Sequence, residues 1–268
     1  AHPFTTSFHP TDVRITTRVD PEDLLSSLFS SIHEGGHALY EQGLPIDHYG
    51  TPLGEAISLG LHESQSRLWE NCVGRSLAFW SHFYPYLQET FPERFEGVDL
   101  ETFYRAVNTV YPSLIRVEAD EVTYNLHIML RFEVERALIE EDLAVEKLPA
   151  LWSDKMEAYL GIRPETDAEG VLQDVHWSGG AFGYFPTYTL GNLYAAQFFN
   201  QANKDLPDLE DKISKGDLLP LKTWLNEKIH RWGRQYSSEQ ILWRVCGEAP
   251  NPVYFTNYLE EKFGKIYL

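Results

Sequence analysis

Hydrophobic residues recur along most of this chain at the three- and four-residue spacing of amphipathic helices. Asp20 and Pro21 are expected to cap and begin a helix that continues through LLSSLFSSIHEGGHALYEQG to Gly43, where glycine can take a left-handed conformation. Further helices are predicted over residues 55–90, with a break near Ser81, and over residues 114–142, 149–160, 187–202, 218–236 and 251–263. The fold class is therefore predicted to be mainly α.

Two segments depart from the helical pattern. Residues 12–18 alternate and are rich in β-branched side chains, which predicts one short strand. Residues 170–186 contain four glycines and several aromatic residues, which predicts a long functional loop with at most one hairpin. No internal repeat or linker divides the sequence, so a single region is expected.

The charge balance narrows the classes of partner. Asp and Glu total 40 against 22 Lys and Arg, which gives a formal net charge of −18. Nucleic acids and anionic membranes bind basic surfaces, so neither is expected as a partner. No apolar run approaches the roughly 18 residues that span a membrane. Two cysteines cannot form a disulfide framework, which favours a reducing compartment, and we expect a cytoplasmic protein.

The strongest chemical signal is the HExxH motif at residues 33–37. Residues four apart share a helix face, so His33 and His37 can bind one metal ion while Glu34 acts as general base. Each of the two central glycines weakens a helix by about 1 kcal/mol, which indicates close approach of another backbone or of substrate. The alternative is a pair of surface histidines on an amphipathic helix.

A catalytic zinc site needs a third protein ligand beside an open position. Glu63 follows His37 by 26 residues, enough for a loop and a return on a second helix. His62 and Glu55 are rival ligands, and a merely solvated polar helix face is the remaining alternative. Glu70, two turns beyond Glu63, can accept a hydrogen bond from a histidine ligand.

Five segments together resemble the M32 family of metallocarboxypeptidases, the carboxypeptidase Taq type. In chain order they are DVRIT (12–16), HEGGH (33–37), HESQ (62–65), IRVEAD (115–120) and GVLQDVHW (170–177). The resemblance implies a zincin-like helical fold around a deep groove, with a short strand or hairpin near the active site. It also implies a metal-dependent hydrolase that removes single residues from peptide C-termini, assembles as a homodimer and uses Glu63 as third ligand.

The resemblance covers only part of a family member. Members carry a helical portion upstream of the DxRxT segment, and this chain lacks it. We therefore expect residues 1–268 to be the C-terminal part of a longer chain and to form a single metallopeptidase catalytic region. The ligand set His33, His37 and Glu63 suits Zn²⁺, and Co²⁺ fits the same geometry.

Candidates for stabilising the oxyanion lie in or just after the glycine-bearing loop. They are His176, Tyr184 and Tyr188, because hydrolysis needs a donor aimed at the developing negative charge. The alternative is that these aromatic rings cover an edge of the core.

An exopeptidase also needs a positive group for the substrate's terminal carboxylate. Arg116 is the first candidate, because a guanidinium pairs with a carboxylate through two parallel bonds. Its alternative role is a helical ion pair with Asp120 four residues on. Arg14 is the reserve candidate, on a strand that either binds peptide by β-augmentation or is an ordinary edge strand.

Two other functions stay open at this point. One is a non-catalytic metal-binding or scaffolding fragment, and the other is an endopeptidase or dipeptidase of the same metal class. His127, among apolar residues of the helix predicted over 114–142, is expected to be a satisfied core histidine rather than a ligand.

Overall fold

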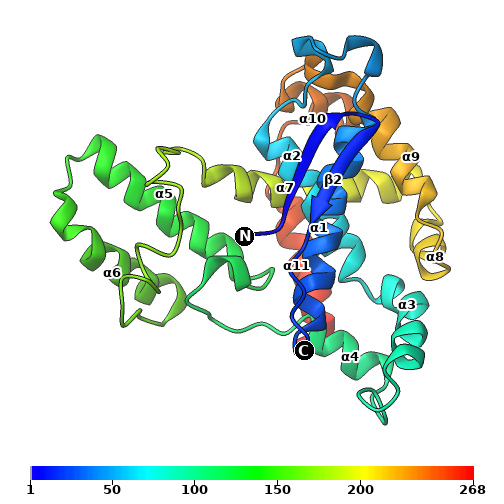
Figure 1. The fold of residues 1–268 in the computed structure, drawn as a ribbon, viewed down its shortest axis with the longest axis horizontal. Helices are drawn as coiled ribbons and strands as arrows, with labels where there is room; N and C mark the ends of the chain where they lie inside the picture. The colour runs from blue at the N-terminus through cyan, green and yellow to red at the C-terminus, as the bar shows by residue number, and fades with distance from the viewer. Residues whose placement is uncertain (1) are drawn as a thin grey trace. The chain divides into compact units, whose positions relative to one another are not determined.

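The computed structural model describes residues 2–268 and is mainly helical, with one two-stranded antiparallel sheet (Figure 1). The mainly α prediction is therefore confirmed. The chain divides into two compact units: the first contains the described residues up to 107 together with 190–268, and the second contains residues 108–189. That residues 1–268 act as one catalytic region stays a prediction.

The first unit contains the hairpin and most of the helices (Figure 1). Its elements are β1 Phe4–His9, β2 Asp12–Thr16, α1 Leu24–Gly43, α2 Leu59–Arg67, α3 Leu77–Thr90, α4 Leu100–Val107, α8 Leu209–Ser214, α9 Leu219–Lys228, α10 Ser238–Cys246 and α11 Val253–Tyr267. A π-helix, Leu68–Gly74, continues α2 directly. The second unit contains α5 Tyr124–Glu140 and α6 Leu148–Leu160, and α7 Pro186–Asp205 begins there and continues into the first unit.

The sheet is a hairpin rather than a single strand. β2 occupies the predicted segment and pairs with β1 in antiparallel register, with Thr5 opposite Ile15. An irregularity between Ser7 and His9 precedes the turn. β1 (FTTSFH) is rich in aromatic and β-branched side chains, and that composition could have identified it from the sequence.

Helix α1 begins one turn later than expected. The backbone N–H of Asp23 donates to the carbonyl of Asp20 at 3.2 Å, which closes a turn before the helix. Asp23 then caps α1 by accepting the N–H of Ser26 at 3.0 Å. Gly43 is the last helical residue and is not left-handed. A Cβ at Gly43 would lie 2.6 Å from the side chain of His230, so glycine is needed for close packing.

Two long predicted helices are divided differently from the expectation. Between α2 and α3 the helical run ends at Gly74, and Ser76 caps α3 by accepting the N–H of Phe79, so no break falls at Ser81. In the second unit α5 begins only at Tyr124, because the Asp120 side chain accepts two backbone N–H groups just ahead of it. Arg116 therefore lies in a short 3₁₀ turn, Arg116–Glu118, outside the long helix.

The helix predicted over 218–236 is interrupted. α9 ends at Lys228, and a separate 3₁₀ segment covers His230–Gln235. Gly233 has a φ of 48°, and a Cβ there would lie 1.9 Å from the carbonyl oxygen of Leu53. Only glycine fits this position, and its conformation puts a kink in the 3₁₀ segment, so no regular helix continues to residue 236.

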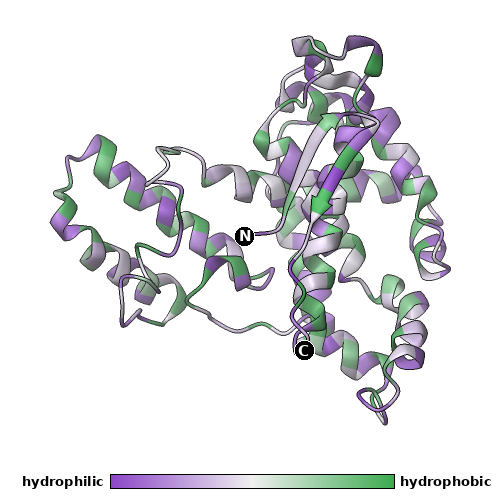
Figure 2. Cartoon of the chain, viewed as in Figure 1, coloured by the Kyte–Doolittle hydropathy of each residue, from purple (hydrophilic) through white to green (hydrophobic). Residues whose placement is uncertain are grey.

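Each unit has its own buried core. In the first unit, α1 and α2 meet a cluster that includes Tyr40, Leu61, Leu68 and Trp224. In the second unit, α5 and α6 meet around Leu130, Trp152 and Met156. Figure 2 shows hydrophobic and hydrophilic residues interleaved along the helices. Within residues 2–268, no helix has the length and hydropathy that a bilayer span requires.

The segment between α6 and α7 follows the loop prediction for residues 170–186. Turns occupy it until α7 begins at Pro186, and none of its described residues forms a helix or strand. Gly180 and Gly183 both have positive φ, which glycine adopts without strain. The helices α4, α8 and α10 were not expected, and all three are short.

Candidate metal centre

The metal cluster of the first unit consists of His33, His37 and Glu63. One ligand atom of each lies within 4.8 Å of the others. Glu63 Oε2 lies 3.7 Å from His33 Nε2 and 3.5 Å from His37 Nε2. Two imidazole nitrogens and one carboxylate oxygen are ligands that divalent zinc-type ions bind, so this donor set fits such an ion.

Helices α1 and α2 meet closely at this cluster because of one glycine. A Cβ at Gly36 would lie 2.6 Å from both the carbonyl oxygen of Gln65 and the Cα of Ser66. At Gly35 a Cβ would meet nothing within 4 Å. The second glycine of the motif therefore lets the backbone of α2 approach α1, and the first faces open space.

Glu63 is held by partners that sequence analysis did not identify. Its Oε1 accepts the Nε–H of Arg67 at 2.8 Å, which leaves Oε2 toward the two histidines. From α7, Gly191 packs against it, since a Cβ there would lie 2.4 Å from Glu63 Cγ. Burial raises the pKa of Glu63, but Arg67 and the two imidazoles outweigh burial and hold that pKa well below its ordinary value.

Glu70 accepts a hydrogen bond from a ligand histidine, as the sequence analysis suggested. His33 Nδ1 lies 2.8 Å from Glu70 Oε2, and Arg67 and Arg75 also bond to this carboxylate. Burial opposes ionisation of Glu70, yet Arg67 and its other partners lower its pKa to about 2. Burial lowers the pKa of His33, but Glu63 and Glu70 together raise it above the ordinary value.

The two rival ligands lie elsewhere. Nδ1 of His62 lies 2.6 Å from Nδ1 of His37, on the ring edge opposite Glu63, so His62 does not join the ligand atoms. Glu55 is half exposed and pairs with Arg234 at 2.7 Å. The polar face formed by Glu63, Ser66, Arg67 and Glu70 is not solvated either, because Ser66 is fully buried and the other three side chains are at most 14 % exposed.

Glu34 lies between the two histidines on α1 and is 6 % exposed. The hydroxyl of Thr5 on β1 donates to Glu34 Oε2 at 2.6 Å and also lies 2.9 Å from its carbonyl oxygen. The hairpin therefore fixes the orientation of the expected general base. Thr5 was missed because no local pattern links a strand hydroxyl to a residue 29 positions away.

The second unit contains a buried cluster of two arginines and one aspartate. Arg116 donates from Nη2 to Asp174 at 2.7 Å and from Nη1 to the Tyr124 hydroxyl at 2.9 Å. Arg131, fully buried, donates from Nε to the other oxygen of Asp174 at 2.7 Å. The alternative of a helical ion pair between Arg116 and Asp120 is wrong, because Arg116 precedes the helix and pairs with Asp174.

The charged groups of this arginine–aspartate cluster shift one another's pKa values. Burial raises the pKa of Asp174, but Arg116 and Arg131 outweigh burial and keep it below its ordinary value. Burial lowers the pKa of Arg131 to about 10, so it is protonated near neutral pH. Burial, with the nearby arginines, also lowers the pKa of His127 to about 3. His127 is a core histidine, but among the described residues neither ring nitrogen has a hydrogen-bond partner.

The oxyanion candidates lie beside the arginine–aspartate cluster in the same unit. His176 Nε2 lies 2.9 Å from the Tyr188 hydroxyl, and the His176 and Tyr184 ring centroids are 5.2 Å apart. The Arg116 guanidinium lies 4.7 Å from the Tyr188 ring centroid. In contrast, Arg14 on β2 is exposed and pairs with Asp12 at 2.8 Å.

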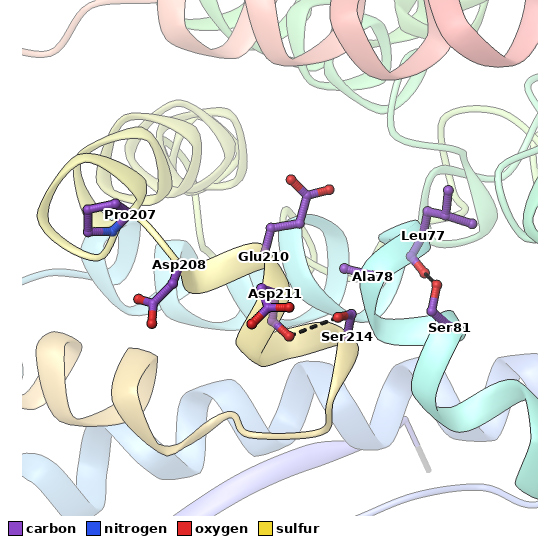
Figure 3. Close-up of a pocket in the computed structure, with 8 residues that line it drawn as sticks. All are labelled: Leu77, Ala78, Ser81, Pro207, Asp208, Glu210, Asp211 and Ser214. Carbon is purple, nitrogen blue, oxygen red and sulfur yellow. Dashed lines mark hydrogen bonds between the residues drawn. The ribbon is translucent and has the colours of Figure 1, made fainter.

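A pocket in the first unit is lined by α3, α8 and the residues just before α8 (Figure 3). None of its eight lining residues belongs to the metal cluster or to the candidate base. Two of its acids already pair with lysines, Asp208 with Lys212 and Asp211 with Lys215. We assign no role in the chemistry to this pocket.

Comparison with known proteins places the chain in a metallopeptidase family, which is consistent with a metal-binding role for the metal cluster. Residues 1–263 match the family described as carboxypeptidase Taq (M32) metallopeptidase. Over 267 residues the chain is 53 % identical to thermostable carboxypeptidase 1 of Thermus thermophilus and 47 % identical to carboxypeptidase 1 of Bacillus subtilis. All of the chain is covered in both comparisons, against 52 % and 53 % of the relatives, so it spans about half their length.

The fold agrees as well. The crystal structure of an M32 carboxypeptidase from Deinococcus radiodurans superposes with a TM-score of 0.97 at 48 % identity, covering 99 % of this chain and 54 % of that one. A metallopeptidase family implies a divalent metal, and the donor set of His33, His37 and Glu63 is suited to one. The chain therefore belongs to the carboxypeptidase Taq (M32) metallopeptidase family.

Proposed function

We propose that this chain carries the catalytic residues of a metal-dependent carboxypeptidase that removes residues from the C-termini of peptides. The convergence of His33, His37 and Glu63, with Glu34 beside them on α1, is the observation that carries the proposal. The relatives are named carboxypeptidases, which supports the same reaction.

We assign the metal as zinc, held by His33, His37 and Glu63, with cobalt able to replace it. A bound ion of this kind lowers the pKa of a water ligand to about 7 and polarises a carbonyl group. Arg67 holds Glu63 Oε1, so the carboxylate presents Oε2 without further rearrangement. Glu70 holds His33 through Nδ1, which leaves Nε2 directed to the same place.

Glu34 is the general base in this proposal. One of its oxygens accepts the proton of the attacking water, and the carboxyl group later donates that proton to the leaving amine. Thr5 holds Oε2 by its hydroxyl, which leaves Oε1 for proton transfer. A general base of this kind contributes about 10²–10⁴-fold to the rate.

Arg116 is proposed to bind the terminal carboxylate of the substrate. Its bonds to Asp174 and Tyr124 occupy three of its five N–H groups. Arg116 and Arg131 share one carboxylate, so their cluster carries a surplus positive charge that a substrate anion can balance. Arg14 remains the reserve, since its exposed guanidinium already pairs with Asp12.

The oxyanion donor is proposed to come from His176, Tyr184 and Tyr188. The contact between His176 and the Tyr188 hydroxyl supports this group, because it orients a polar hydrogen beside Arg116.

We further propose peptide substrates, a homodimer and a cytoplasmic location. Neither Cys72 nor Cys246 forms a disulfide within residues 2–268, which is consistent with a reducing compartment.

An assay of the metal-loaded protein with an N-blocked dipeptide tests the reaction. We expect release of the C-terminal residue alone. Internal cleavage of longer peptides would instead support an endopeptidase. Tight zinc binding without turnover would support a non-catalytic metal-binding fragment.

The base assignment is tested by Glu34→Gln. We expect zinc affinity to stay unchanged while kcat falls at least 100-fold, because the amide cannot accept the proton. Glu22→Gln, at an exposed acid ahead of α1, is the matched control and should retain full activity. Turnover retained in Glu34→Gln would remove Glu34 from the base role.

The anchor assignment is tested by Arg116→Ala with free and C-terminally amidated peptides. We expect KM to rise for the free acid and to stay nearly constant for the amide, since only the acid needs the positive charge. Arg14→Ala is the comparison variant. Equal effects of Arg116→Ala on both substrates would contradict the anchor role.

A further inference from the structure

Three side chains form a hydrogen-bonded chain that leads away from the metal cluster. Nδ1 of His37 lies 2.6 Å from Nδ1 of His62, and Nε2 of His62 lies 2.8 Å from Oε1 of Glu41. His37 and Glu41 are one turn apart on α1, and His62 reaches them from α2, beside Glu63. We call these three residues the His37–His62–Glu41 chain.

The positions of the protons follow from the acceptor at the end of this chain. An ionised carboxylate can only accept hydrogen bonds, so Nε2 of His62 must donate to Glu41. Burial raises the pKa of Glu41, but the bond from His62 outweighs burial and keeps it below the ordinary value, so the carboxyl group is ionised at neutral pH.

A neutral imidazole has one N–H, so Nδ1 of His62 is then an acceptor. The hydrogen in the bond between the two rings therefore belongs to Nδ1 of His37. Nε2 of His37 is left unprotonated, and this atom lies 3.5 Å from Glu63 Oε2. With His62 neutral, both bonds of the chain are satisfied when His37 presents the lone pair of Nε2 to the metal cluster.

We propose that His62 and Glu41 are positioning residues that fix the tautomer and ring orientation of His37 for metal binding. The inference rests on the proposed function, which requires a metal. The two ligand histidines are held by different means: His33 bonds directly to the carboxylate of Glu70, and His37 bonds to an imidazole that is itself held by Glu41.

The tautomer can be measured on the metal-free protein. Long-range ¹H–¹⁵N NMR of ¹⁵N-histidine-labelled protein distinguishes protonated from unprotonated ring nitrogens, and His37→Gln and His62→Gln assign the two rings. We expect His37 to be protonated at Nδ1 and bare at Nε2. His62 should be protonated at Nε2 and bare at Nδ1. A proton on Nε2 of His37 would overturn the proposal.

Zinc affinity provides a second measurement, made by chelator competition. His62→Phe keeps a ring beside Tyr40 and His37 but removes both nitrogens, and we expect zinc affinity to fall 10–100-fold. Glu41→Leu should reduce the affinity by a similar factor. Glu41→Gln should keep much of the zinc affinity that Glu41→Leu loses, because the amide oxygen still accepts the hydrogen bond from His62. A purely structural role of Glu41 would not produce this difference between the two variants.

A matched control is His82→Phe, the same substitution at a histidine of α3 in the same unit. The zinc affinity of His82→Phe should equal that of the wild-type protein. A zinc affinity of His62→Phe within twofold of the wild-type value would contradict the proposal. The NMR result does not depend on turnover. The expected tautomers in a protein that cleaves no peptide would refute the proposed function alone, and the opposite tautomer in an active enzyme would refute only the role of His62 and Glu41.

Discussion

Two buried charge clusters, one in each unit, differ in the sign of the charge that they leave unbalanced. The first unit brings three carboxylates together with two guanidinium groups and two imidazoles. The carboxylates are those of Glu34, Glu63 and Glu70, and the guanidinium groups are those of Arg67 and Arg75. In the second unit, Arg116 and Arg131 share the single carboxylate of Asp174. The first cluster has a surplus acid and the second has a surplus cation.

This difference indicates what each cluster can bind. Unbalanced charges are costly to bury, so a surplus persists where a ligand of the opposite sign completes it. The acidic surplus and two imidazoles suit a divalent cation. The guanidinium surplus suits a carboxylate, such as the end of a peptide. Membership of a metallopeptidase family implies a divalent metal, in agreement with the interpretation of the first cluster. The predictions below test the two clusters separately.

The largest effect on stability is expected for Asp174→Ala. Removal of the shared carboxylate leaves two buried guanidinium groups unpaired, which should cost about 3–5 kcal/mol in the free energy of unfolding. Urea denaturation measures the change. Arg131→Met leaves one balanced pair and should cost less. A cost for Arg131→Met equal to that of Asp174→Ala would contradict the idea of a surplus cation.

The next effect concerns the contact between α1 and α2. Gly36→Ala forces a methyl group against the backbone of residues 65 and 66, which should destabilise the protein by about 1–3 kcal/mol and weaken zinc binding. Gly35→Ala is the matched control, with open space for its methyl group. It should stabilise the helix by up to about 1 kcal/mol and leave zinc affinity unchanged. Equal zinc affinities in the two variants would show that Gly36 does not set the cluster geometry.

A third effect is the pH dependence of stability. Burial lowers the pKa of His127, in the second unit, from 6.5 to about 3. Between pH 3 and pH 6.5, His127 of the unfolded chain binds a proton that the folded chain does not bind. The contribution of neutral His127 to the free energy of unfolding is therefore complete above pH 6.5 and is lost as the pH falls.

His127→Leu tests this contribution in metal-free protein. The slope of unfolding free energy against pH should decrease by about 1.4 kcal/mol per pH unit between pH 6 and 3.5. His230 in the first unit has its pKa lowered to about 3 by burial as well, and its ring bonds to Gln65. An unchanged slope in His127→Leu would mean that His127 is not a buried neutral group.

The smallest effect is expected at the hairpin. Arg14 and Asp12 are both exposed, and exposed ion pairs contribute little. Arg14→Ala should leave the urea midpoint unchanged and should raise KM for free-acid peptides less than Arg116→Ala does. A larger KM effect at Arg14 would exchange the roles of the two arginines.

The metal cluster could be predicted from sequence in large part because its signal is local. His33, Glu34 and His37 lie within one helical turn, so helix geometry alone places them together. Glu63 was one of three candidate ligands on sequence grounds, and the resemblance to M32 enzymes decided between them. Close approach of a backbone or of substrate was expected at both central glycines, and a close backbone is found at Gly36 but not at Gly35.

The features that sequence did not predict depend on contacts between residues that are far apart along the chain. Asp174 lies 58 positions beyond Arg116, and no periodicity predicts their bond. Thr5 and Glu34 meet because an unexpected strand, β1, packs beside α1. His62 looked like a rival ligand, since sequence cannot show which edge of His37 it faces. Capping by Asp120 likewise removed Arg116 from a helix that its neighbours had predicted.

The central claim is that three side chains of the first unit bind one divalent ion. A crystal structure of zinc-loaded protein, with anomalous data at the zinc edge, tests it most directly. We predict one ion about 2.0–2.2 Å from His33 Nε2, His37 Nε2 and Glu63 Oε2, with Arg67 still bonded to Oε1. An anomalous map with no peak between the two rings, or with Glu63 turned away from the ion, would contradict the account.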